Sequence, residues 1–75
     1  MPFIHVMAFS GRDMEAKRKM AEAIVKAASA ASDAPESAFT VAFEEFPREN
    51  WEKDVAKVKI EPLRDKILVD HGKPV

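Results

Sequence analysis

The sequence predicts an α+β fold, in which a β-α-β unit with parallel strands is followed by a short helical C-terminal segment. Three observations support this: an apolar run over residues 3–9, an alanine-rich amphipathic pattern over 14–31, and alternation over 38–45. A strand, a long helix and a strand in that order predict two parallel strands joined by a right-handed crossover. With 75 residues, the chain is expected to form one domain over residues 1–75.

The first strand is expected over Phe3–Phe9, because aromatic and aliphatic residues dominate this run, as they do in a buried strand. The next four residues, Ser10–Asp13, predict a turn that ends in Asp13 as the N-cap of the following helix. The turn contains Gly11 and Arg12.

The helix is expected from Met14 to about Ala31, since alanine favours helix and permits a close approach to a sheet. Its apolar face is expected to consist of Met20, Ile24, Ala28 and Ala31, with Lys17 and Ala21 flanking it. The opposite face carries two i,i+4 pairs with the acid first, Glu15–Lys19 and Glu22–Lys26. The short basic cluster Lys17–Lys19 predicts a solvated surface of the same helix.

Pro35 is expected to end the helical region and direct the chain into extended structure. The following strand is predicted over Ala38–Glu45, where Phe39, Val41 and Phe43 share one face. The other face carries Thr40, Ala42 and Glu44, so this strand is expected to be half-buried.

The C-terminal region is expected to hold short helices and a tail. Asn50 is predicted to cap a helix with Trp51, Val55 and Val58 on one face. Pro62 suits the first turn of a new helix better than the interior of one long helix. Gly72 is expected to end the helical segment, leaving residues 73–75 as a tail.

Composition limits the partners of this chain. Twelve basic and thirteen acidic residues give a net charge of -1, which favours neither nucleic acid nor an anionic membrane as a partner. No segment is long enough to span a bilayer, and a cytoplasmic location is the expectation. Two strands do not form a stable sheet alone, and the chain has no cysteine for a disulfide. We therefore expect a homo-oligomer, most simply a dimer that pairs two such sheets into one of four strands.

Several short motifs together resemble a known family: Pro2-Phe3-Ile4-His5-Val6, Gly11-Arg12 and Asp33-Ala34-Pro35. In this order, around an amphipathic helix, they resemble the tautomerase superfamily and, within it, the 4-oxalocrotonate tautomerase group. The resemblance covers roughly residues 2–45. The remainder, with Pro47, Asn50-Trp51 and Ile60-Glu61-Pro62, is similar to a slightly longer bacterial branch that includes a dimeric phenylpyruvate-type tautomerase.

The resemblance implies that Pro2 is the catalytic general base, once Met1 has been removed. A free N-terminal proline is a secondary amine, whereas a proline inside a chain is a tertiary amide and has no basic nitrogen. An unperturbed α-amino group titrates at about 7.7–8.0, close to the value that a general base needs at neutral pH. Phe3 and Phe9 are candidates for apolar surroundings that disfavour the charged form. The alternative is that Pro2 merely starts an edge strand.

The resemblance also implies that Arg12 binds the substrate carboxylate, for which the planar guanidinium is well suited. Thr40 occupies the position of a second family arginine and offers a hydroxyl without a charge. This departure favours a monocarboxylate with an apolar or aryl group, such as a phenylpyruvate-like 2-oxo acid, over a dicarboxylate. Trp51 and Phe9 are candidates for the pocket wall, although Trp51 suits the core or a dimer interface equally well.

The resemblance implies a cofactor-independent tautomerase, and the longer C-terminal region with its resemblance favours a dimer over a hexamer. If Met1 is retained, the same scaffold would be a non-catalytic module that binds small acids or assists assembly. A third alternative is hydration or dehalogenation, for which Glu44 and Glu45 are the available carboxylates. His5 and His71 have no metal-ligand spacing, so no metal is expected. A proline base needs no other cofactor, and none is expected.

Overall fold

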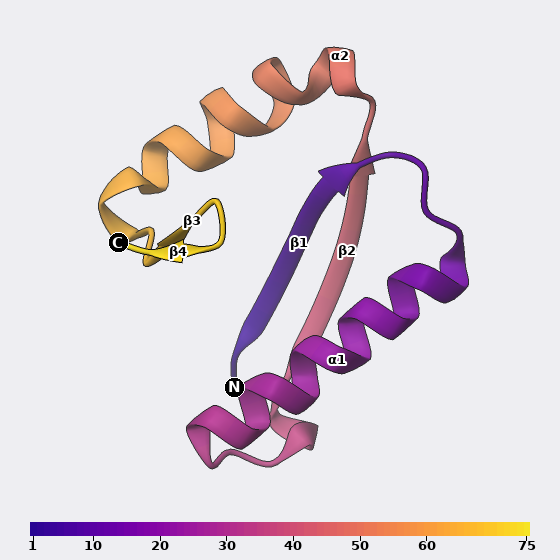
Figure 1. Cartoon of the computed structure of the whole chain (residues 1–75), viewed down its shortest axis with the longest axis vertical. Coiled ribbons are helices and arrows are strands. Elements are labelled where there is room, and N and C mark those ends of the chain that lie inside the picture. The colour runs from indigo at the N-terminus through magenta and orange to yellow at the C-terminus, as the bar shows by residue number, and fades with distance from the viewer.

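Two parallel strands form the framework of the protein. The computed structural model describes residues 1–75 and places β1 (Phe3–Phe9) beside β2 (Thr40–Phe46). The register runs without a break from Phe3 opposite Thr40 to Phe9 opposite Phe46. Helix α1 connects the two strands, so the predicted β-α-β unit is confirmed (Figure 1).

Helix α1 (Met14–Ser32) begins and ends where the sequence predicts. The Asp13 side chain accepts a hydrogen bond from the backbone N–H of Ala16 at 2.8 Å and so satisfies one of the free donors of the first turn. At the other end Asp33 adopts a left-handed conformation, with φ 62°, and donates its backbone N–H to the carbonyl of Ser29. A single 3₁₀ turn, η1 (Glu36–Ala38), then leads into β2.

The face that α1 turns to the sheet agrees with the predicted one only in part. Met20 and Ala31 are exposed, whereas Ala21 and Val25 lie against Val41 of β2. Ile24 and Ala28 are half-buried as predicted, so the buried face is shifted toward Ala21 and Val25 rather than replaced.

The other face of the sheet carries no helix from the β-α-β unit. It presents Phe3, His5, Met7 and Phe9 from β1, because side chains alternate along a strand. The first strand was expected to be buried, but Phe3 is 65 % exposed. On this open face His5 Nε2 lies 2.9 Å from Glu44 Oε1 of the neighbouring strand.

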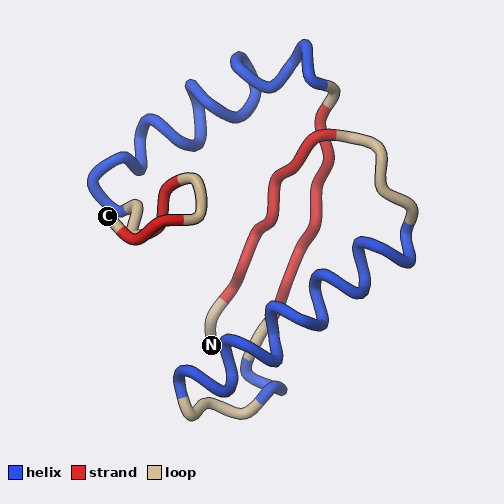
Figure 2. Tube along the Cα trace, in the orientation of Figure 1, coloured by secondary structure: helices blue, strands red, loops and turns tan.

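After β2 the chain forms an arm of helical segments and a hairpin (Figure 2). The segments are α2 (Arg48–Trp51), η2 (Glu52–Ile60), wound as a π-helix, and η3 (Glu61–Lys66), wound as a 3₁₀-helix. Asn50 does not cap a helix as predicted. The extended conformation of Pro47 starts the helix earlier, and the Asn50 N–H already donates to the Pro47 carbonyl at 3.0 Å. Pro62 lies in the first turn of η3, as predicted.

The last residues are not a free tail. β3 (Val69–Asp70) pairs antiparallel with β4 (Lys73–Pro74) across a two-residue turn. His71 and Gly72 both have positive φ, at 49° and 80°, which is the pattern of a type I′ hairpin turn. Sequence reasoning assigned Gly72 to a helix end, where a positive φ is equally common, and so missed the hairpin.

One chain alone has little core. Val55, 2 % exposed, is the one fully buried residue, while apolar side chains of the arm remain in solvent. These exposed side chains are Val58, Leu63, Leu68, Val69 and Val75. None of the helices combines the length and apolar character needed to cross a membrane.

Substituting Asp13→Ala tests the helix start. The change removes the acceptor of the Ala16 N–H, and the free energy of unfolding should fall by about 1 kcal/mol. Urea unfolding at fixed protein concentration, followed by circular dichroism, measures this. Glu15→Gln, an exposed change in the same turn, should alter stability far less, and equal effects would contradict the capping role.

Candidate functional site

The sequence-predicted site residues lie at two opposite ends of β1. Pro2 and Thr40 are at the start of the strands, whereas Arg12, Phe9 and Trp51 are at their end. The seven-residue strand between these ends spans about 20 Å. Within one chain the structure therefore brings together the proposed carboxylate-binding residue and the aromatic residues, and keeps Pro2 apart from them (Figure 1).

Pro2 is held in place through its backbone. Its carbonyl accepts a hydrogen bond from the Thr40 N–H at 3.1 Å, which continues the β1–β2 ladder by one step. Pro2 and Thr40 are both exposed, and the Phe3 ring lies 6.1 Å from the His5 ring. A base at this position would be open to a substrate or to a second chain.

Arg12 is fixed at the other end by two acceptors. Its Nη1 donates to the Phe9 carbonyl at 3.0 Å and lies 3.6 Å from Glu45 Oε2. The Arg12 backbone N–H also donates to Glu45 Oε2, at 3.3 Å. The preceding Gly11 has φ 135°, a conformation that favours glycine and turns the chain back toward β2. The remaining guanidinium donors make no hydrogen bond within the chain.

Glu45 joins a second cation to this end of the sheet. Lys17 Nζ of α1 lies 3.7 Å from Glu45 Oε1, and the Glu45 side chain is only 13 % exposed. Lys17 was predicted to belong to a solvated surface, but it is mostly buried because it faces β2. Glu45 follows Val41 and Phe43 in the alternation along β2 and so lies on the face that packs against the helix. This alternation is the signal in the sequence that a basic residue of the helix could face a carboxylate there.

Aromatic residues surround the same end on the open face of the sheet. The Trp51 ring meets the Phe9 ring edge-on, with centroids 4.8 Å apart, and lies 6.5 Å from the Phe46 ring. Arg48, which sequence reasoning missed, stacks its guanidinium 4.5 Å from the centre of the Phe9 ring. Trp51 is half-buried in this cluster, so it is available both as packing and as a wall for an apolar ligand.

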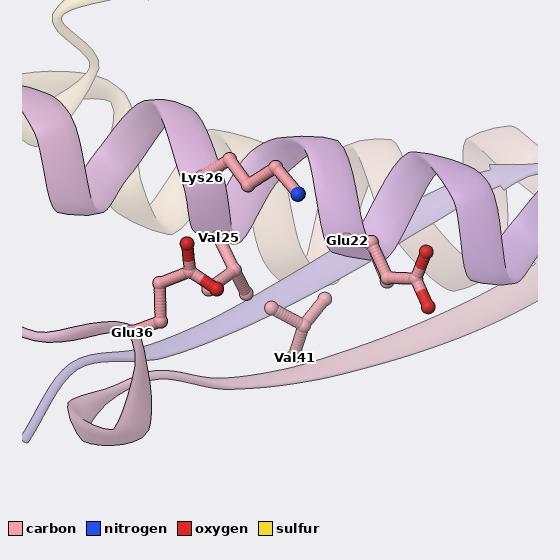
Figure 3. Close-up of a pocket in the computed structure, with 6 residues that line it drawn as sticks. Glu22, Val25, Lys26, Glu36 and Val41 are labelled. Atoms are coloured by element: carbon pink, nitrogen blue, oxygen red, sulfur yellow. The ribbon is translucent and has the colours of Figure 1, made fainter.

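Two hollows lie between α1 and β2. The larger, about 460 Å³, has Val25 and Val41 at its floor and Glu22, Lys26 and Glu36 at its rim (Figure 3). It contains none of the residues predicted to act on a substrate. The smaller, about 220 Å³, is lined by apolar residues together with Lys17 and Arg18, and it includes Phe43, whose ring centre is 6.0 Å from Arg12 Cζ. The smaller hollow therefore adjoins the Arg12 end of the sheet.

The histidines are paired with carboxylates. His5 contacts Glu44, and His71 Nδ1 lies 3.2 Å from Asp70 Oδ1. No group of three or more potential metal ligands lies together in the chain.

Comparison with protein families gives one match. The family model described as "Tautomerase enzyme" matches residues 2–55, which include β1, α1, β2 and the start of the helical arm. The matched segment begins at Pro2 and ends at the buried Val55. Among curated proteins, none matches this chain.

Replacing Trp51 by leucine tests the aromatic cluster. Trp51→Leu removes the edge-on contacts with Phe9 and Phe46, and stability should fall by about 1–2 kcal/mol. Arg48→Gln is the matched control, since an exposed cation–π contact contributes about 0.5–1 kcal/mol. Unfolding is followed by circular dichroism because the variant lacks its only tryptophan. A larger effect from Arg48→Gln would show that the rings are not the main contribution.

Proposed function

The chain belongs to the tautomerase family, and from this premise we propose that it is a cofactor-independent tautomerase with Pro2 as its general base. The observation that carries the proposal is the start of the family match at Pro2, the residue directly after Met1. Removal of Met1 converts the Pro2 nitrogen from an amide into a secondary amine. The substrate class is an enolisable 2-oxo acid with one carboxylate, of the phenylpyruvate type, which corresponds to the dimeric branch that the C-terminal region resembles.

The proposed reaction is a proton transfer between carbon and oxygen. The Pro2 nitrogen takes a proton from C3 of the 2-oxo acid, the C3–H electron pair forms the C2=C3 double bond, and the carbonyl electron pair moves to oxygen. The prolinium then returns the proton to that oxygen, which gives the enol. Arg12 holds the carboxylate with its free guanidinium donors and stabilises the negative charge that develops nearby.

The separation of Pro2 from Arg12 supports a site shared between two copies of the chain. In an antiparallel pairing of two sheets, Pro2 of one chain would approach Arg12 of the other. The exposed area supports such an assembly. The chain exposes 5897 Å², whereas a compact monomer of 8.4 kDa exposes about 4,600 Å². The excess of about 1,300 Å² per chain falls within the range that obligate homodimers bury.

The proposed preference for a monocarboxylate with an aryl group follows from the residues at the two ends of the β1–β2 sheet. Thr40, beside Pro2, carries no charge and cannot pair with a second carboxylate. Phe9 and Trp51, beside Arg12, offer aromatic surface for an aryl group. We therefore propose Thr40, Phe9 and Trp51 as substrate-contacting residues, and a dimer in preference to a hexamer.

The role of Pro2 is tested by blocking its nitrogen. Inserting one glycine between Met1 and Pro2 leaves Pro2 as an amide, and phenylpyruvate keto–enol exchange should slow by about 100-fold or more. Mass spectrometry of the native N-terminus establishes whether Met1 is absent. Pro74→Ala, at the distant hairpin, is the control and should keep full activity. Full activity with Met1 retained would overturn the mechanism, and binding of acids without exchange would favour a non-catalytic module.

The shared site is tested by mixing two inactive variants. Chains with the inserted glycine supply Arg12, and Arg12→Gln chains supply Pro2, so a mixed dimer contains one intact site. After denaturation and refolding of an equal mixture, activity should recover to about one quarter of the wild-type value, because half the dimers are mixed. Failure to recover any activity in dimers shown to exchange would place Pro2 and Arg12 of one site in the same chain.

A further inference from the structure

Glu45 is a carboxylate at a position where an apolar residue is expected. It follows Val41 and Phe43 on the helix-facing side of β2, and its side chain is 13 % exposed. Burying a charge is costly unless partners compensate it. The partners here are Arg12 on one carboxylate oxygen and Lys17 on the other.

We propose that Glu45 sets the charge of the Arg12 end at +1 and thereby selects substrates with a single carboxylate. The inference rests on the proposed function, in which Arg12 binds the substrate carboxylate. Two cations, Arg12 and Lys17, share one carboxylate, so the cluster has one positive charge in excess. One substrate carboxylate neutralises that charge, whereas a second would remain without a partner.

The count covers the cations that contact Glu45, which are Arg12 and Lys17; other charged groups near this end form no ion pair with it. The Asp13 carboxylate accepts from the Ala16 N–H, and Glu44 contacts His5 on the open face. Arg48 lies over the Phe9 ring, also on the open face. Arg18, at the rim of the small hollow, is exposed and forms no ion pair within the chain, so solvent screens it more strongly than Lys17.

Glu45 also positions Arg12. It accepts from the Arg12 backbone N–H at 3.3 Å and contacts Nη1 at 3.6 Å, while the Phe9 carbonyl accepts from the same Nη1. These contacts use one edge of the guanidinium and leave the other donors for a ligand. The hollow of about 220 Å³ beside Lys17 and Phe43 provides space next to this cluster.

The test compares Glu45→Gln with its neighbour Glu44→Gln. Glutamine keeps the shape of Glu45 and an acceptor for the Arg12 N–H, but it raises the cluster to +2. The ratio of kcat/KM for a 2-oxo dicarboxylate to that for phenylpyruvate should rise by roughly three- to tenfold in Glu45→Gln, mainly through KM. The rise should shrink in high salt. Glu44→Gln, on the open face, should leave the ratio unchanged.

Lys17→Met supplies a second, independent change. It lowers the cluster to zero charge, so the same ratio should fall and KM for phenylpyruvate should rise. If Glu45→Gln does not fold, as judged by circular dichroism, Lys17→Met tests the proposal in its place. An unchanged ratio of the two kcat/KM values in Lys17→Met would then overturn the proposal. An unchanged ratio in folded Glu45→Gln also overturns it.

Binding of unreactive acids separates this inference from the proposed reaction. Phenylacetate and phenylsuccinate, with one and two carboxylates, are titrated into each protein and followed by NMR. A shift of binding preference toward phenylsuccinate in Glu45→Gln supports the charge assignment, whether or not the protein turns over phenylpyruvate. An absence of turnover together with this shift would refute the tautomerase proposal and leave the charge assignment intact. Equal preferences in wild type and Glu45→Gln would refute the charge assignment alone.

Discussion

The parallel register of β1 and β2 determines where every other group of interest lies. With Phe3 opposite Thr40 and Phe9 opposite Phe46, the starts of both strands share one end of the sheet, and their last residues share the other. Because side chains alternate along a strand, the same register places Val41, Phe43 and Glu45 under α1 and leaves His5 and Glu44 on the open face. A slip of one residue would exchange these two sets and separate Glu45 from Lys17.

The same two-stranded arrangement leaves much of the chain exposed. A sheet of two strands has two free edges, and here one of its faces also lacks a covering helix from the β-α-β unit. The single buried residue, Val55, cannot provide the apolar burial that offsets the conformational entropy of 75 residues. In the proposed dimer, the exposed apolar residues of the arm and the open sheet face are the surfaces that a second copy would cover.

Local signals in the sequence predicted local structure well. The Phe3–Phe9 strand, the Asp13 cap and the place of Pro62 depend on a few neighbouring residues, and all were correctly predicted. The buried face of α1 was predicted in part: Ile24 and Ala28 are half-buried as expected, whereas Met20 is exposed and Ala21 is not, a difference that apolar character alone does not show. The roles of Lys17 and Glu45 depend on a contact between residues 28 positions apart in the sequence, which periodicity cannot show. The resemblance supplied Pro2 and Arg12 as candidates, but only the structure showed that one chain keeps them apart.

A charge of +1 at the Arg12 end suits the proposed reaction better than a larger one. Transfer of a proton from C3 to Pro2 creates a prolinium cation and an enolate anion together, so these two charges compensate each other. The substrate carboxylate is then the one remaining anion, and the excess charge of the Arg12, Lys17 and Glu45 cluster matches it. Without Glu45 the end would hold two uncompensated cations, which would bind the carboxylate more tightly in the ground state and the transition state alike. Such uniform binding lowers KM without raising kcat. A mostly buried carboxylate beside Arg12 is therefore consistent with the proposed catalysis, because it limits the charge of the proposed site to what one monocarboxylate can neutralise.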